Sequence, residues 1–123
     1  MKVVARGAHA YRANGLTAMF IPCGRDAAYI IEAAVGITRL EPKENGDLYV
    51  AVTLPNLIVG TVGGGTGLPA QRECLELLGC YGPENGKKFA KICAAVCLAG
   101  EISINAAIVA GHFTSAHKAL RRK

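Results

Sequence analysis

The sequence has few charged residues and few aromatic ones. Of its 123 residues, 19% are charged, 6% are aromatic and 51% are hydrophobic. This balance excludes a disordered chain and predicts one packed domain. The formal net charge is +5, and basic residues crowd the C-terminal end, at Lys118, Arg121, Arg122 and Lys123. We expect a solvated helix end there. An anionic ligand or partner ranks second, and nucleic acid third, because too few aromatic residues accompany the basic ones.

No two cysteines have the CxxC spacing, and no signal-peptide pattern precedes the five that are present (Cys23, Cys74, Cys80, Cys93 and Cys97). An odd number of cysteines without such a leader predicts reduced thiols in a cytoplasmic protein. Cys93 and Cys97 share a helix face but have no further zinc ligands nearby. His112 and His117 are about 140° apart around a helix, so they do not form a metal-binding pair. We therefore predict no metal site, and buried thiols with a structural role.

A long apolar run, residues 92–113, raises the question of a membrane span. Glu101 lies near its middle, where a charge in lipid is costly, and the run is rich in alanine and glycine. We interpret the run as closely packed helix in the protein interior and predict no membrane partner.

The most distinctive stretch is residues 60–67, which hold five glycines in eight positions. An apolar strand pattern over residues 48–59 leads into it, and a helical pattern over residues 68–78 follows it. Glycines allow positive φ and close approach of backbone to a ligand, and a helix start favours an anion. The stretch lacks the Lys-Ser/Thr of a Walker loop, and its match to the dinucleotide fingerprint (Gly65, Gly67, Ala70) is weak. A phosphate or dinucleotide site and a tight structural turn both stay open.

The order of patterns predicts an α+β fold. Residues 11–35 are helical with a break at Pro22, and Gly36 ends the helix. Residues 37–40 and 47–53 form a β-hairpin across Asn45-Gly46 and deliver the glycine-rich loop. Pro69 begins and Gly79 closes the next helix, and residues 87–120 form a long Ala/Gly-rich helical segment. We expect three or four helices around the hairpin.

Two side chains are candidates for proton transfer. Asp26 lies at the break after Pro22 in an otherwise apolar helix, where burial and a cation would tune its protonation. The alternative is a surface aspartate paired with Arg25, which the residues alone favour. His117 lies in the last helical turns, where the helix dipole stabilises imidazolium. His112 is more typical of a buried structural histidine.

Four segments together resemble the C-terminal third of hydroxymethylglutaryl-CoA reductase. They are residues 23–28 (CGRDAA), 54–66 (LPNLIVGTVGGGT), 98–103 (LAGEIS) and 110–117 (AGHFTSAH). They follow the family's order and spacing, and the resemblance covers roughly residues 10–122. It implies that the whole of residues 1–123 is the C-terminal portion of the catalytic, substrate-binding domain, a partial domain without the family's small cofactor domain.

The resemblance also implies the chemistry. The family reduces hydroxymethylglutaryl-CoA to mevalonate, a precursor of isoprenoids, with two hydrides from NADPH at a site shared between subunits. By resemblance Asp26 is the catalytic aspartate and His117 protonates the departing thiolate. Asn14 lies near the hydroxymethylglutaryl group, and the cofactor packs on the backbone of Val62, Gly63, Gly64 and Gly65. NADH in place of NADPH stays open.

The chain departs from the family pattern at several points. The catalytic glutamate and lysine and the main cofactor motif would lie upstream of these residues. Tyr11 stands where the family has a histidine, Pro22 replaces a small residue, and Arg25 replaces a glutamine. We therefore expect a cytoplasmic homodimer or larger oligomer whose isolated chain is inactive. The alternative is a non-catalytic fragment that binds CoA, another anion or a partner.

Overall fold

The fold is α+β, as predicted, and is built on a three-stranded antiparallel sheet. The computed structural model describes residues 3–8 and 10–110. The strands β1 (Val3–Ala8), β2 (Val35–Pro42) and β3 (Leu48–Thr53) lie in the order β1-β2-β3. The hairpin pairs Pro42 with Leu48 and Ile37 with Thr53, and its turn lies at residues 43–47. The hairpin is therefore confirmed, and β1 adds a strand on the other side of β2 that the sequence patterns did not reveal.

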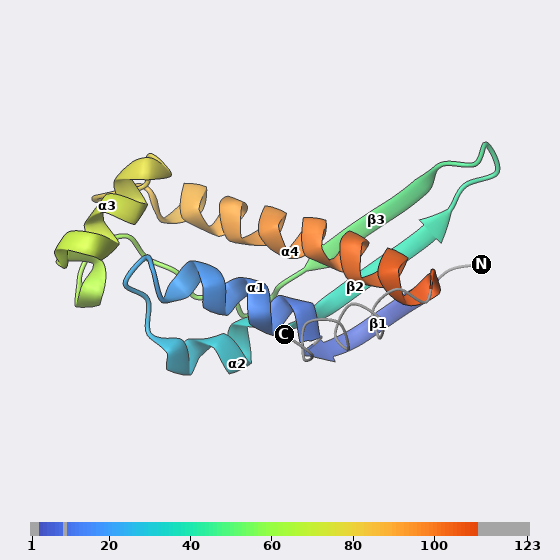
Figure 1. The fold of residues 1–123 in the computed structure, drawn as a ribbon, viewed down its shortest axis with the longest axis horizontal. Helices are drawn as coiled ribbons and strands as arrows, with labels where there is room; N and C mark the ends of the chain where they lie inside the picture. The colour runs from blue at the N-terminus through green and yellow to red at the C-terminus, as the bar shows by residue number, and fades with distance from the viewer. Residues whose placement is uncertain (1–2, 9, 111–123) are drawn as a thin grey trace, which may run out of the picture.

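Within the described residues, four α-helices and two short 3₁₀ turns accompany the sheet. The α-helices are α1 (Ala10–Phe20), α2 (Ile30–Ala33), α3 (Pro69–Leu77) and α4 (Gly86–Val109). The 3₁₀ turns cover Ala27–Tyr29 and Gly64–Gly67. In Figure 1, α1 and α4 run side by side, and α3 lies at the end of the molecule opposite the hairpin tip.

The expected break near Pro22 is confirmed. α1 ends at Phe20, and residues 21–26 form a turn before the chain becomes helical again. After the break, Ile30 turns into the core, whereas the adjacent Ile31 is 77% exposed. Gly36, expected to end the helix, instead lies inside β2. A Cβ there would come within 2.2 Å of the Thr53 carbonyl oxygen, so close strand packing requires glycine.

A buried arginine fastens α1 to the beginning of β2. Arg12 is fully buried and donates from Nε to the Ala34 carbonyl oxygen at 2.9 Å. Its Nη1 donates to Thr38 Oγ1 at 2.5 Å, and its Nη2 to the Gly36 carbonyl oxygen at 3.2 Å. These bonds satisfy polar groups that would otherwise be costly to bury. They fix the position of α1, and hence of the turn that follows it.

The core lies between the helices and the inner face of the sheet. Its buried members from α1 and the following turn are Leu16, Phe20 and Cys23, and those from α4 are Phe89, Cys93 and Cys97. α1 and α4 approach closely where the Tyr11 ring fills the space beside Gly100. α4 runs unbroken through Gly100, and the close packing predicted for this apolar run is confirmed at that position.

Candidate functional site

The glycine-rich stretch adopts the positive φ angles that its composition predicted. Gly63 has φ +80° and Gly64 has φ +56°, a region that other L-residues rarely adopt. Residues 64–67 form a 3₁₀ turn, and the buried Thr66 donates from Oγ1 to the Gly63 carbonyl oxygen at 2.7 Å. A Cβ at Gly63 or Gly67 would meet no atom within 4 Å. At these two positions the backbone of the glycine loop, residues 60–67, therefore borders open space.

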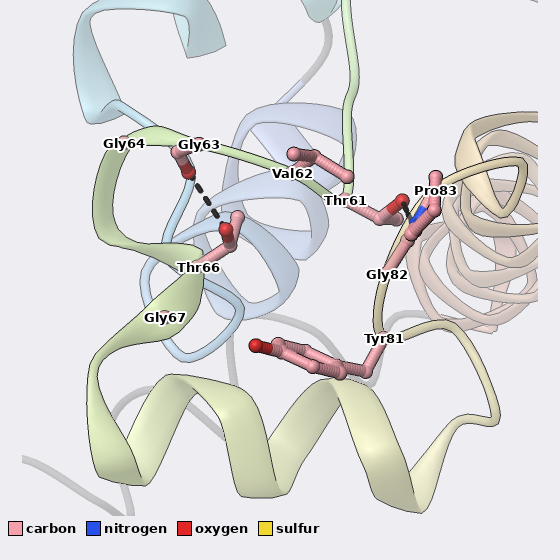
Figure 2. A pocket seen from close by; sticks show the side chains of 9 residues that line it. All are labelled: Thr61, Val62, Gly63, Gly64, Thr66, Gly67, Tyr81, Gly82 and Pro83. Atoms are coloured by element: carbon pink, nitrogen blue, oxygen red, sulfur yellow. Dashed lines mark hydrogen bonds between the residues drawn. The ribbon is translucent and has the colours of Figure 1, made fainter.

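A hollow of about 330 Å³ lies beside the loop. Figure 2 shows loop residues on one side of it and residues 81–83 on the other. Thr61 ties the two sides together by donating from Oγ1 to the Gly82 carbonyl oxygen at 2.5 Å. The ring of Tyr81 lines the hollow and stacks on the Arg72 guanidinium of α3, with 4.6 Å between Cζ and the ring centroid.

Sequence patterns did not identify Tyr81 as a site residue. Residues 80–85 are irregular in the structure and connect α3 to α4, which begins at Gly86. The Tyr81 ring reaches the loop because the chain reverses direction after α3, at Gly79, which has φ +67°. This change of direction places the ring at the hollow. The position of the ring therefore could not be predicted from the local sequence pattern.

The turn that carries Asp26 packs directly against the glycine loop. Gly24 has φ +78°, and a Cβ there would lie 2.6 Å from the carbonyl carbon and oxygen of Gly65 and 2.7 Å from the Thr66 nitrogen. A neighbouring bond, from the Arg25 backbone nitrogen to the Phe20 carbonyl oxygen at 2.8 Å, holds this turn on the end of α1. Two segments about 40 residues apart in sequence thus meet backbone to backbone.

Asp26 is exposed, as the surface interpretation predicted, and is not buried in an apolar helix. Its Oδ1 accepts a hydrogen bond from the Ala28 backbone nitrogen at 2.9 Å and caps the turn Ala27–Tyr29. Among the residues that the structure describes, no ion pair joins it to Arg25, so the pairing expected in the surface interpretation is wrong. The cap leaves Asp26 accessible at the edge of the junction with the loop.

The structure describes no contact between this junction and the remaining candidate site residues. Asn14 is exposed on α1, about 9 Å of helix before Phe20. His117, His112 and His9, with the basic C-terminal residues, lie outside the residues that the structure describes. The junction therefore brings together the Asp26 turn and the loop that contains Val62, Gly63, Gly64 and Gly65.

All five cysteines lie in the described part of the chain and carry free thiols. Burial raises the pKa of Cys93 to about 12 and that of Cys97 to about 11. Such thiols are poor nucleophiles and poor metal ligands near neutral pH. Within residues 3–8 and 10–110, no group of three or more His, Cys, Asp or Glu side chains is arranged to hold a metal ion.

One described helix, α4, is long and apolar enough to cross a membrane by length and composition alone. Core helices of soluble proteins meet the same criterion. Here α4 packs against α1 and β3, and it buries Glu101. The expectation that no membrane is involved stays a prediction.

Known proteins resemble almost the entire chain. The family model of hydroxymethylglutaryl-coenzyme A reductase matches residues 1–122. The reductase of Methanocaldococcus jannaschii is 49% identical over 116 residues, which cover 94% of this chain and 28% of that protein. The reductase of Pyrococcus horikoshii is 50% identical over 121 residues, covering 94% of this chain and 29% of that protein. For the reductase of Aeropyrum pernix these values are 47%, 96% and 30%.

The chain thus spans less than a third of the length of these relatives. The matched region includes the Asp26 turn, the glycine loop and α4. The resemblance seen in four short segments therefore extends over the whole fold, and the chain belongs to the hydroxymethylglutaryl-coenzyme A reductase family.

Proposed function

We propose that this chain supplies one wall of a reductase site that converts hydroxymethylglutaryl-CoA to mevalonate. The observation that carries the proposal is the backbone contact between Gly24 and Gly65, which joins the Asp26 turn to the glycine loop. A hydride-transfer site needs a group that donates or accepts protons and a surface that the cofactor can approach closely. Asp26 and the glycine-rich loop would provide these on one side of the site.

The loop fits a nicotinamide cofactor. Glycines 63 and 67 leave open space where a Cβ would project, and the hollow next to them is partly walled by the Tyr81 ring. We infer that the backbone of residues 62–65 would pack against NADPH, with NADH as the alternative. The bound cofactor would supply the hydride.

The chain's own residues would manage protons and position the substrate. Asp26, held at its backbone by the turn and accessible to solvent, would influence proton delivery to the reacting carbonyl oxygen. Thiolate departs as CoA leaves, and His117 would protonate it, because an imidazolium donates a proton readily near neutral pH. Asn14 would hydrogen-bond the hydroxymethylglutaryl group.

The catalytic glutamate and lysine are proposed to come from outside these 123 residues. Without that ammonium, nothing would stabilise the developing oxyanion. We therefore expect no mevalonate formation above background when the isolated chain is given hydroxymethylglutaryl-CoA and NADPH. Product formation at the rate of a full-length reductase would contradict this.

Calorimetric titration separates the proposal from a purely partner-binding fragment. The proposal predicts saturable binding of CoA or NADPH by the isolated chain, and loss of NADPH binding when the hollow is blocked by Gly67→Leu. Gly46→Leu, at the hairpin turn far from the loop in Figure 1, serves as the control. A folded chain that binds neither ligand would overturn the assignment of the loop.

We also propose that the chain associates with itself. A second hollow, of about 450 Å³, lies between the sheet and the end of α4 and is almost entirely apolar. On its rim, Leu48 is 54% exposed and Val109 is 89% exposed. Apolar surface of this kind is typical of protein–protein contacts. Light scattering should therefore give a mass above that of one chain.

A further inference from the structure

The Arg25 side chain has no partner in the described part of the chain. Its Nε is buried and makes no hydrogen bond, and no ion pair or other polar contact involves the guanidinium there. By contrast, Arg39 pairs with Glu41 and Arg72 pairs with Glu76. Arg25 therefore stands out as a half-buried cation whose donors are unused.

A buried N–H donor of this kind costs free energy unless another group accepts its hydrogen bond. Arginine stays protonated at any physiological pH and carries five N–H donors in a planar fork. A buried donor without an acceptor loses its hydration and gains nothing in return. A ligand oxyanion would satisfy the fork, because carboxylate and phosphate match its geometry with two parallel hydrogen bonds.

The guanidinium lies at the junction that forms the candidate site. A Cβ built on Gly60, the first residue of the glycine loop, would lie 3.5 Å from Arg25 Nη1. The residue before Arg25 is Gly24, which contacts Gly65, and the residue after it is Asp26, whose Oδ1 is engaged by the Ala28 nitrogen. Arg25 thus belongs to the Asp26 turn and also lies beside the first residue of the glycine loop, and its neighbour Gly60 has no side chain to block access.

We propose that Arg25 binds the phosphate or carboxylate group of an anionic ligand at the junction of the Asp26 turn and the glycine loop. The identity of that ligand rests on the proposed function, which offers NADPH and CoA as phosphate-bearing sources. The binding of an oxyanion does not rest on it. Because Arg25 replaces a family glutamine, this contact would be a property of this chain and its close relatives.

The first test uses no enzyme activity. The ¹⁵N-labelled chain is titrated with inorganic phosphate and pyrophosphate while the arginine Nε–H resonances are followed by NMR, with Arg25→Lys identifying the Arg25 signal. We expect a saturable shift of that signal, with the ion-paired Arg39 and Arg72 unchanged. No shift at Arg25, or equal shifts at all three arginines, would overturn the proposal.

The second test identifies the source of the anion. Calorimetry compares NADPH, NADH and CoA on the wild-type chain, Arg25→Gln and Arg25→Lys, with Arg39→Gln as a control that removes the same charge elsewhere. We expect Arg25→Gln to weaken at least one ligand by roughly tenfold or more, Arg25→Lys to weaken it less, and Arg39→Gln to have no effect. Circular dichroism verifies that each variant is folded.

The pattern of losses assigns the contact. A loss for NADPH alone points to the phosphate that NADH lacks, an equal loss for both nucleotides points to their shared pyrophosphate, and a loss for CoA alone points to the CoA phosphates. Unchanged affinity of Arg25→Gln for every ligand that the wild-type chain binds would overturn the proposal. If the wild-type chain binds none of the three, the proposed function fails, and the phosphate titration alone decides the role of Arg25.

Discussion

At the scale of single residues, two buried thiols have pKa values well above the usual value for cysteine. Cys93 and Cys97 are fully buried on α4. Loss of solvent is the largest cause of their raised pKa values, and at Cys93 the neighbouring thiol of Cys97 adds to it. Thiols of this kind support the core by packing and not by reactivity.

The raised pKa of Cys93 predicts a loss of stability in alkali. In the unfolded chain this thiol ionises near pH 9, whereas in the folded chain it holds its proton until about pH 12. Between these values the unfolded state releases the proton first, so the free energy of unfolding falls as pH rises. Urea unfolding at several pH values should show this fall, and Cys93→Ala should show a shallower one. An identical pH slope in the two proteins would contradict the prediction.

The residue scale also shows where sequence reasoning stops. The burial of Cys93 and Cys97 could be predicted, because they sit at helical spacing in an apolar run, whereas Cys74, also expected to be buried, is only half-buried. The residues alone also favoured an exposed Asp26, but the direction that the chain takes after the break at Pro22 could not be predicted. That Arg25 has no partner among the described residues could not be foreseen either, since only tertiary contacts reveal whether a cation has a partner.

At the scale of elements, the site depends on a contact between two backbones. The turn of residues 21–26 and the glycine loop can approach this closely because Gly24 has no side chain, and a Cβ at Gly65 would also be tight, at 3.3 Å from the Gly24 carbonyl oxygen. The break in the helix thus serves two purposes: it ends α1 at the core, and it presents the Asp26 turn to the loop.

Gly24→Ala tests this contact, with Gly46→Ala as its matched control. Both glycines have positive φ, but a Cβ at Gly46 meets nothing within 4 Å, whereas one at Gly24 clashes with the Gly65 backbone. We expect Gly46→Ala to cost about 1–2 kcal/mol from backbone strain. Gly24→Ala should cost at least about 3 kcal/mol, because the overlap adds to the strain. Equal losses in thermal unfolding would show that the two segments do not pack tightly.

A second pair of variants tests the crossing of α1 and α4. A Cβ at Gly100 would lie 1.6 Å from the Tyr11 ring, whereas one at Gly86, on the same helix, meets nothing within 4 Å. Gly100→Ala should lower the free energy of unfolding by about 1–3 kcal/mol despite the higher helix propensity of alanine. Gly86→Ala should be neutral or slightly stabilising. Restoration of stability in Gly100→Ala by Tyr11→Ala would identify the ring as the obstacle, and a neutral Gly100→Ala would refute the close crossing.

Most elements follow from local chemistry. Pro69 and Gly79 bound α3, and Asn45-Gly46 lies in the hairpin turn, as their backbone preferences predict. β1 and the position of Gly36 in a strand could not be predicted, because strand pairing joins residues far apart in sequence. The path of the chain from Thr53 to the glycine loop is likewise set by packing and not by local pattern.

At the scale of the whole molecule, the site and the hairpin tip occupy opposite ends (Figure 1). The Asp26 turn, the glycine loop and α3 form one end, held by the α1–α4 core and by Arg12. The chain spans less than a third of related reductases, so its proposed role is that of one wall in a larger assembly.

The most direct measurement is the activity of a chimaera. The matching segment of the Methanocaldococcus jannaschii reductase, which is 49% identical, is replaced by these 123 residues, and oxidation of NADPH by hydroxymethylglutaryl-CoA is followed. We expect the chimaera to be active, Asp26→Asn to lower kcat by roughly 100-fold or more, and Asp47→Asn, at the hairpin turn, to leave kcat unchanged. A folded chimaera without activity, or one in which Asp26→Asn works as well as the parent, would contradict the assignment of this chain as a wall of the reductase site.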